Sequence, residues 1–306
     1  MDKNDADVLM DTDLPLPLFI KGKVRDTFDL GSHLLIVATD RISAFDVVIP
    51  SPIPCKGFVL NQLSLFWFRR TVDLIPNHLV EPVNDLHNLD SYITAENRFQ
   101  YPSYLLGRSM VVKKVKRLPV ECVVRGYLAG SAWVEYQQNG TIAGASVRKG
   151  LLESQELPEV LFTPTSKADT GHDEAITLDE MKKMVGDKLA GEMEEKSVAI
   201  YRYARRHALE KGIIIADTKF EFGLDGDKLI LIDELLTPDS SRFWDIELYE
   251  VGKSQPSYDK QPLRDWLVAS GWNKEPPAPT LPPEVVEATT RGYVKAYEKL
   301  TGKALC

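Results

Sequence analysis

The sequence has 306 residues, 43% of them hydrophobic and 27% charged, which is enough to bury a sizeable core and to divide into two lobes. The formal net charge of −8 at pH 7 gives no bulk attraction to nucleic acid or to an anionic membrane. No run approaches the roughly 20 apolar residues of a membrane span, and the acidic start is unlike a secretory or mitochondrial leader. The widely spaced Cys55, Cys122 and Cys306 predict neither a disulfide framework nor a zinc site. We therefore expect a cytoplasmic globular protein that binds neither nucleic acid nor a membrane.

The first part of the chain predicts a loose tail and then an antiparallel sheet. Residues 1–17 are acidic and interrupted by prolines, which is typical of a loose tail. Beyond them, alternating segments broken at Gly22 and Gly31 predict strands joined by turns. Residues 57–70 have helical spacing.

A boundary between two lobes is predicted near the middle of the chain. Residues 109–133 read as two strands separated by a short basic connector that ends at Pro119. We therefore assign residues 18–117 to an N-terminal lobe and residues 118–306 to a C-terminal lobe.

The C-terminal lobe is predicted to contain several helices. Residues 177–211 have helical spacing and begin at Thr177 with the form of a capping box. Gly186 or Gly191 is expected to break this helix in two. Two further packing helices are expected over residues 261–270 and 283–300.

A densely charged hairpin is predicted in the same lobe. Residues 213–223 alternate so that Asp217, Lys219 and Glu221 share one face of a strand, opposite two phenylalanines. Residues 229–234 then return as a second strand. One face of the hairpin is therefore predicted to carry charge and the other to join the core.

The hairpin loop decides whether two acids can share a metal. A loop over residues 224–226, with Gly226 in the left-handed conformation, would place Asp233 on the face of Glu221. A two-residue loop over 225–226 would place it on the opposite face. We expect the three-residue loop or an equivalent bulge, because a carboxylate on the apolar face would lose solvation without a partner. Magnesium takes one or two protein carboxylates, so Glu221 and Asp233 are the candidate Mg²⁺ ligands.

Gly22, Lys23, Val24 and Arg25 form a candidate phosphate loop. A glycine turn can lay backbone amides and two cations against a polyphosphate. A plain basic hairpin explains the same residues, and it is favoured when the segment is considered alone.

A second candidate anion site lies after the predicted boundary. Arg125 ends an apolar strand and precedes two glycines and Ser131, so a guanidinium fork would lie beside amides and a hydroxyl. An arginine that pairs with a carboxylate or caps a helix explains this pattern equally well. A turn after the charged hairpin directs Asp239 and Arg242, with Ser241 between them, towards the same site.

Residues 162–174 form a polar segment that suits either a substrate loop or a solvated one. It contains Lys167, His172 and Asp173, and His172 is favoured as a hydrogen-bonding residue. Across these segments the acids suit magnesium, the cations suit phosphate and the hydroxyls suit a polar substrate. Metal-dependent phosphoryl-transfer chemistry is therefore predicted.

The order of these motifs resembles the SAICAR synthetase family. The motifs are GKVRD, ATDRISAFD, VVRGYLAGS, FTPTSKAD, ADTKFEFG and LTPDSSRFW, and the similarity spans residues 18 to about 300. It is closest to the fungal-type enzymes with a single function. The resemblance implies an α+β fold with two lobes, namely an antiparallel-sheet N-terminal lobe resembling a kinase N-lobe and an ATP-grasp-like C-terminal lobe with additional C-terminal helices.

The resemblance also implies an activity. The expected reaction joins L-aspartate to the carboxylate of CAIR, a ribonucleotide, through an acyl phosphate, and it consumes ATP with Mg²⁺ to give SAICAR, ADP and phosphate. A monomer is expected. Other readings of the residues are a different ATP-dependent small-molecule kinase or ligase, or a non-catalytic nucleotide-binding protein. A requirement for an amine cosubstrate would distinguish the ligase from a kinase.

Roles for individual residues follow from the resemblance. ATP would contact Gly22, Lys23, Val24 and Arg25 through its phosphates, and the connector from Lys113 to Arg117 through adenine. Glu221 and Asp233 would hold the magnesium linked to ATP. The ribonucleotide pocket would be formed by Arg125, Ser131, Lys219, Asp239, Ser241 and Arg242. The groups expected to act at the reacting atoms are Lys167, Asp173 and Lys219.

Overall fold

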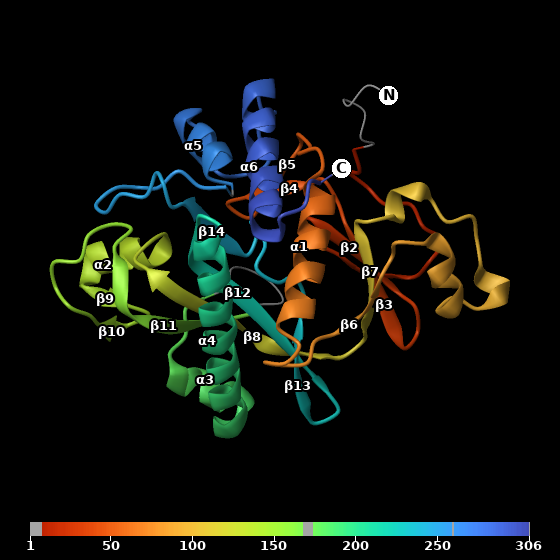
Figure 1. Ribbon diagram of the computed structural model, residues 1–306, viewed down its shortest axis with the longest axis horizontal. Coiled ribbons are helices and arrows are strands. Elements are labelled where there is room, and N and C mark those ends of the chain that lie inside the picture. The colour runs from red at the N-terminus through yellow and green to blue at the C-terminus, as the bar shows by residue number, and fades with distance from the viewer. Residues whose placement is uncertain (1–7, 168–173, 259, 306) are drawn as a thin grey trace. The chain divides into compact units, whose positions relative to one another are not determined.

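The computed structural model describes residues 8–167, 174–258 and 260–305, and the chain divides into two compact units. Unit 1 consists of residues 1–66, 78–114 and 258–306, and unit 2 of the remainder. The observed boundary after Lys114 lies close to the predicted one. The C-terminal residues belong to unit 1, however, which differs from the prediction that they extend the second lobe. Figure 1 labels most of the elements of both units.

Unit 1 contains the predicted antiparallel sheet, with strand order β1-β2-β3-β7-β6. Its strands are β1 Leu18–Lys21, β2 Arg25–Asp29, β3 His33–Ala38, β6 Leu79–Pro82 and β7 Ser109–Lys113. A small hairpin of β4 Ile42–Ala44 and β5 Val47–Ile49 follows the third strand. The helices are α1 Lys56–Arg70, of which residues 67–70 belong to unit 2, and α5 Gln261–Ala269 and α6 Pro283–Thr301. Short 3₁₀ turns lie at Leu86–Ser91, Ala95–Asn97 and Ser103–Leu105.

The C-terminal helices join unit 1 because they cover its buried groups. Lys56, at the start of α1, is fully buried, and its ammonium lies 5.6 Å from the centre of the Tyr293 ring of α6. The backbone N–H of Leu281 donates to Ser51 Oγ at 2.8 Å. These contacts join residues more than 200 positions apart, so no local pattern could predict them.

Residues 8–17 are not the loose tail that composition predicts. Leu9 and Leu14 are buried and pack in a cluster with Phe28 and Val37 of the sheet. The backbone of Leu9 also exchanges hydrogen bonds with Asp40. Burial of these leucines offsets the entropy of ordering a Pro-rich acidic segment. Residues 1–7 lie outside the described residues.

Unit 2 is built on an antiparallel sheet of order β11-β8-β12-β13, and β14 pairs with the other end of β12. The strands are β8 Lys116–Tyr127, β11 Glu156–Ser166, β12 Ile213–Asp225, β13 Lys228–Ile232 and β14 Ser241–Asp245. A short hairpin of β9 Thr141–Ile142 and β10 Ala145–Ser146 follows α2. The helices are α2 Ser131–Asn139, α3 Leu178–Val185 and α4 Asp187–Glu210.

Helix α4 covers one face of this sheet, and Figure 1 shows it beside β8 and β12. The Tyr201 hydroxyl donates to the Ile215 carbonyl at 2.7 Å, while Cys122 and Phe220 are fully buried. The capping box at Thr177 is present, and the helical segment breaks at Gly186, as predicted. The apolar face of the sheet is therefore closed by a helix, which leaves the charged face for a site.

The predicted hairpin loop was wrong. Asp225 pairs with Lys228, so the loop is the two residues Gly226 and Asp227. Gly226 has a φ of +63°, the conformation required of a glycine in the first position of a two-residue hairpin turn. This register alone would turn Asp233 away from Glu221.

Asp233 does not follow that register, because β13 ends before it. The strand ends at Ile232, and Asp233 has a φ of +66°, which takes it out of the ladder. Repulsion from Asp233 adds to the effect of burial in raising the pKa of Glu221. The register we expected therefore does not relate the two acids, and Asp233 lies in a bend just beyond the strand.

Among the described residues, no helix is both long enough and apolar enough to cross a membrane.

Candidate functional site

The strand registers of unit 2 gather charged side chains on one face of the sheet. Arg125 and Glu121 of β8 lie opposite Asp217 and Glu221 of β12. On the other side of β12, Arg242 of β14 also lies opposite Asp217. Side chains alternate along a strand, so these residues face away from α4. We call this set the charged face: Glu121, Arg125, Asp217, Lys219, Glu221 and Arg242.

At one end of the charged face, acids and lysines form a tight cluster. Lys167 Nζ lies 2.5 Å from Glu121 Oε1 and 2.7 Å from Glu221 Oε1. Lys219 Nζ donates to the same Glu121 oxygen at 2.9 Å. The Glu121 side chain is only 3% exposed, so both ammonium groups share a carboxylate that water hardly reaches.

The pKa values in this cluster reflect burial and charge. Burial raises the pKa of Glu221, repulsion from Asp233 raises it further, and Lys167 only partly opposes them. Burial also acts to raise the pKa of Glu121, but Lys219 and Lys167 outweigh it and hold that pKa below the usual value. Burial acts to lower the pKa of Lys219, but the combined attraction of Glu121 and Glu221 and the hydrogen bond to Glu121 outweigh it, so that this pKa is raised. Glu221 is therefore the carboxyl that lacks sufficient positive charge.

The other end of the charged face holds two arginines around one acid. Arg125 Nη1 lies 3.1 Å from Asp217 Oδ2, and Arg242 Nη1 pairs with the same oxygen. Arg125 also donates to Thr163 Oγ1 at 3.0 Å and to Ser131 Oγ at 3.3 Å. The two guanidinium groups converge on one carboxylate oxygen, and such groups suit a phosphate or carboxylate ligand.

Gly130 allows Arg242 to reach this position. It has a φ of +58°, and a methyl group added to its Cα would lie 2.3 Å from Arg242 Nη2. A glycine is required both by the backbone conformation and by the close approach of the guanidinium.

One predicted residue faces away from the charged face, one lies in the turn beside it, and one cannot be placed. Ser241 is buried, and its hydroxyl lies 2.8 Å from Thr218 Oγ1, on the opposite side of β14 from Arg242. Because neighbouring strand residues face opposite sides, Ser241 does not join the predicted substrate pocket. Asp239 lies in a turn fastened to β12 by a bond from the Lys219 N–H to the Ser240 carbonyl at 3.0 Å. Asp173 lies outside the described residues.

The predicted phosphate loop forms a tight turn in unit 1. The Gly22 N–H donates to the Arg25 carbonyl at 2.7 Å, and the Val24 carbonyl accepts from the Thr39 N–H at 3.0 Å. Lys23 is half-exposed and pairs with Asp46 at 2.5 Å. Its ammonium would have to leave that carboxylate to reach an anion.

The predicted basic connector is shorter than expected. Lys113 ends β7 and Arg117 belongs to β8, and both are exposed. Pro119 therefore lies inside a strand, where the β8–β12 register shifts. A proline has no N–H to donate, so it is tolerated at such an irregularity.

Sequence reasoning missed Glu121 and Arg41 as site residues. Glu121 interrupts an apolar run in β8, and a single charge in such a run is a signal that could have found it. Arg41 is 7% exposed, and its guanidinium binds the carbonyls of Gly22 and Lys23. Nothing in the local pattern around Arg41 indicates that contact.

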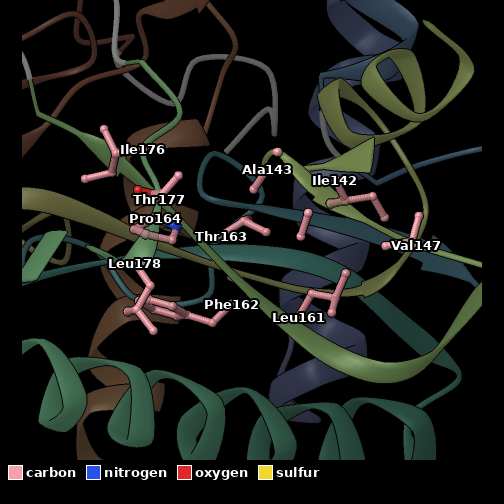
Figure 2. Close-up of a pocket in the computed structure, with 12 residues that line it drawn as sticks. Ile142, Ala143, Val147, Leu161, Phe162, Thr163, Pro164, Ile176, Thr177 and Leu178 are labelled. Carbon is pink, nitrogen blue, oxygen red and sulfur yellow. The ribbon is translucent and has the colours of Figure 1, made fainter. Parts of the chain in front are cut away.

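An apolar cavity of about 330 Å³ lies beside the charged face in unit 2. Figure 2 shows Thr163 and Pro164 of β11 on one side and Ala143 on another. Thr163 lines this cavity and also accepts the hydrogen bond from Arg125. The cavity therefore lies next to Arg125, and its lining is mostly apolar.

Within the parts of the chain that the structure describes, no group of three or more His, Cys, Asp or Glu side chains is arranged to hold a metal ion. The carboxylates of Glu221 and Asp233 are therefore the candidate ligands for a metal ion. Fold and site together define an α+β protein with a cluster of charged side chains on one face of an antiparallel sheet.

Comparison with known proteins identifies the family within that class. A model of the SAICAR synthetase family matches residues 18–279. The phosphoribosylaminoimidazole-succinocarboxamide synthases of Geobacter metallireducens and Syntrophotalea carbinolica are each 52% identical to the chain, over 97% and 96% of it and over 99% and 98% of their own lengths. The chain belongs to the SAICAR synthetase family, as its motifs predicted.

Solved structures agree with this assignment. The SAICAR synthase from Saccharomyces cerevisiae, complexed with SAICAR, is 45% identical with a TM-score of 0.87, covering 97% of this chain and 99% of that one. A SAICAR synthetase in complex with ADP is 24% identical with a TM-score of 0.67, over 93% of this chain and 98% of that one, and it shows the shared fold alone. The predicted α+β fold is confirmed.

Proposed function

We infer that this chain catalyses the ATP-dependent ligation of L-aspartate to the carboxylate of CAIR, giving SAICAR, ADP and phosphate in purine biosynthesis. The observation that carries this is its full-length match to enzymes of that name, at 52% identity over 97% of the chain. Membership of the family confirms the predicted activity and its use of ATP. The positions of individual groups in that reaction are proposals that the geometry supports.

The arginine end of the charged face is proposed to bind CAIR. Arg125 and Arg242 converge on Asp217, and paired guanidinium groups suit the phosphate and carboxylate of an anionic ribonucleotide. Ser131 adds a hydroxyl beside Arg125, and Lys219 adds an ammonium further along the same face. Asp239 lies in the adjoining turn, where it could bind a substrate hydroxyl.

The acidic end is proposed to hold Mg²⁺ through Glu221 and Asp233. The donor set fits, because oxygen ligands suit this ion and because the repulsion that raises the Glu221 pKa would be relieved by a divalent cation. When bound, the ion would neutralise charge on the ATP phosphates.

The phosphate groups of ATP are proposed to bind at the Gly22 turn. Lys23 and Arg25 would contact phosphate together with the Val24 backbone, and Lys113 and Arg117 would lie along adenine. Phosphate binding would draw Lys23 away from Asp46, with which it pairs at 2.5 Å.

The proposed chemistry relies on placement and charge. The CAIR carboxylate attacks the γ-phosphorus of ATP, ADP leaves, and the aspartate amine then attacks the acyl phosphate and expels phosphate. Lys219 and Lys167, held by Glu121, are placed to stabilise the negative charge that develops. Orientation of this kind is worth up to about 7 to 11 kcal/mol, so no protein nucleophile is needed. Asp173 and the departing phosphate are the candidates for accepting the amine proton.

A cytoplasmic location and a monomeric state are also proposed, together with an absence of nucleic-acid partners. The net charge of −8 supports the last of these. Gel filtration with light scattering would test the monomer.

Paired variants separate the two ends of the charged face. Glu221→Gln and Asp233→Asn should abolish ATP-dependent SAICAR formation while the fold is kept, and raising Mg²⁺ should restore part of the activity. Arg242→Ala should mainly raise the KM for CAIR, because it would bind ground and transition states alike. Steady-state kinetics with each substrate varied in turn checks both. Near-normal turnover in both acid variants would remove these residues from the metal site.

A further inference from the structure

A buried arginine, Arg41, donates hydrogen bonds to two backbone carbonyl groups of the proposed phosphate loop. Arg41 Nε donates to the Lys23 carbonyl at 3.1 Å, and Nη2 donates to the Gly22 carbonyl at 3.0 Å. Carbonyl oxygens repel anions, so a loop that receives phosphate must direct them elsewhere. The guanidinium of Arg41 draws two of them to itself.

Arg41 is in turn fixed by a buried acid. Both Asp26 oxygens accept from it, at 3.1 Å from Nη1 and 2.6 Å from Nη2. Asp26 is 1% exposed, and its Oδ2 also accepts from the Thr12 hydroxyl at 2.8 Å. The bidentate pair neutralises the arginine, so its role is to hold geometry and not to supply charge to a ligand.

The same guanidinium reaches the N-terminal segment. Arg41 Nη1 donates to the Met10 carbonyl at 2.6 Å, which brings its hydrogen bonds to five. Leu9 and Leu14 anchor this segment in the core on either side of that contact. Asp40 fastens it further, because it accepts from the Leu9 N–H at 2.8 Å and from the Gly57 N–H at 2.9 Å.

We propose that Arg41 is a positioning residue for ATP, and that residues 9–14 form a strap that holds it against the Gly22 turn. The proposal rests on the proposed role of that turn in ATP binding. All five guanidinium N–H groups are used, so lysine, with three donors on one nitrogen, cannot replace them. A segment that composition assigns to a loose tail is thus part of the support of the nucleotide site.

The proposal is tested on the full-length protein with Arg41→Lys and with the pair Thr12→Val and Thr12→Ser. Arg41→Lys should raise the dissociation constant of ADP, measured by calorimetry without other substrates, and the KM for ATP by about tenfold. The KM values for CAIR and for aspartate should stay within about twofold. Thr12→Val should weaken ADP binding by a smaller factor, and Thr12→Ser should restore it, because only the hydroxyl reaches Asp26.

Controls separate positioning from general damage. Arg98→Lys changes an exposed arginine that pairs with Asp90 in the same unit, and it should leave ADP binding unaltered. All variants are assayed well below their melting temperatures. Equal weakening for all three substrates, or a Thr12→Ser variant as weak as Thr12→Val, would overturn the proposal.

Lys23→Ala distinguishes the proposal from the function on which it rests. If Lys23→Ala weakens ADP binding while Arg41→Lys and Thr12→Val do not, the turn binds nucleotide but Arg41 does not position it. If Lys23→Ala leaves ADP binding unchanged, the turn is not the phosphate loop, and both ideas fail. If Arg41→Lys does not fold, the two Thr12 variants decide the outcome.

Discussion

Glu121 shows how one buried carboxylate organises the charged face. Its side chain is 3% exposed and lies between Lys167 and Lys219, so it keeps two ammonium groups close together that would otherwise repel each other. Removing one partner of a buried ionic group leaves the others uncompensated, which costs more than an exposed pair contributes. Glu121 therefore serves the fold and the proposed site at once.

Glu121→Gln keeps the size of the side chain but removes its charge. We expect the free energy of unfolding at pH 7 to fall by about 3 kcal/mol, together with a loss of SAICAR formation. Glu156→Gln, which alters a partly exposed pair between β11 of the same sheet and Arg205 of α4, should cost less than about 1 kcal/mol. Urea denaturation measures both variants.

The same substitution has a defined pH dependence. The folded protein holds the pKa of Glu121 below its ordinary value of 4.5, so its contribution to stability is present above that value and is lost as pH falls through the folded pKa. The stability gap between the wild type and Glu121→Gln should therefore be constant from neutral pH down to about 5 and should shrink on further acidification. A gap that stays constant to the lowest pH at which the protein folds would contradict the ionised state.

At the scale of elements, α4 packs on β8 at a glycine. A methyl group added at Gly126 would lie 2.0 Å from the Tyr201 hydroxyl, which donates to the Ile215 carbonyl of β12. Gly126 follows Arg125 directly, so this contact fixes the strand that carries the arginine. Helix packing on one face of the sheet thus positions the site on the other.

Gly126→Ala should reduce the free energy of unfolding by about 2 to 4 kcal/mol, because the methyl group displaces a buried hydrogen-bonded hydroxyl. Tyr201→Phe removes that hydroxyl, so the double variant should be more stable than the sum of the two single effects predicts. A double-mutant cycle in urea checks this coupling. Additive effects on the free energy of unfolding would show that the added methyl group does not contact the Tyr201 hydroxyl.

At the scale of the whole molecule, the chain leaves unit 1 after Lys114 and returns to it at Tyr258. The returning helix α6 covers Lys56 with Tyr293, and both side chains are fully buried. Unit 1 is therefore complete only when the last residues of the chain are in place. Its stability should depend on positions far from its sheet in the sequence.

Tyr293→Ala should lower the free energy of unfolding by about 3 to 5 kcal/mol and expose Lys56. Val268→Ala in α5, a residue that is 60% exposed, should change it by less than about 0.5 kcal/mol. Hydrogen exchange should place the loss of protection in unit 1. Loss confined to residues 115–257 would show that α6 supports the other unit.

Local order was predictable where it depends on near neighbours. The alternation that separates Glu221 from Phe220, the capping box at Thr177 and the helix break at Gly186 all follow from residues a few positions apart. The charge pattern also indicated most of the charged face. Local patterns of this kind sufficed to recognise the family.

Long-range contacts decided the rest. Each of these features joins residues that are distant in sequence: the partners of Glu121, the repulsion between Asp233 and Glu221, the burial of Leu9 and the return of α6 to unit 1. Such contacts depend on which apolar and charged surfaces remain exposed once the sheets have formed. Several segments could cover each surface, and no short stretch of sequence determines which segment does. Hydrophobic periodicity and capping residues indicate which face of a helix or strand is buried, whereas tertiary packing determines which residues contact that face.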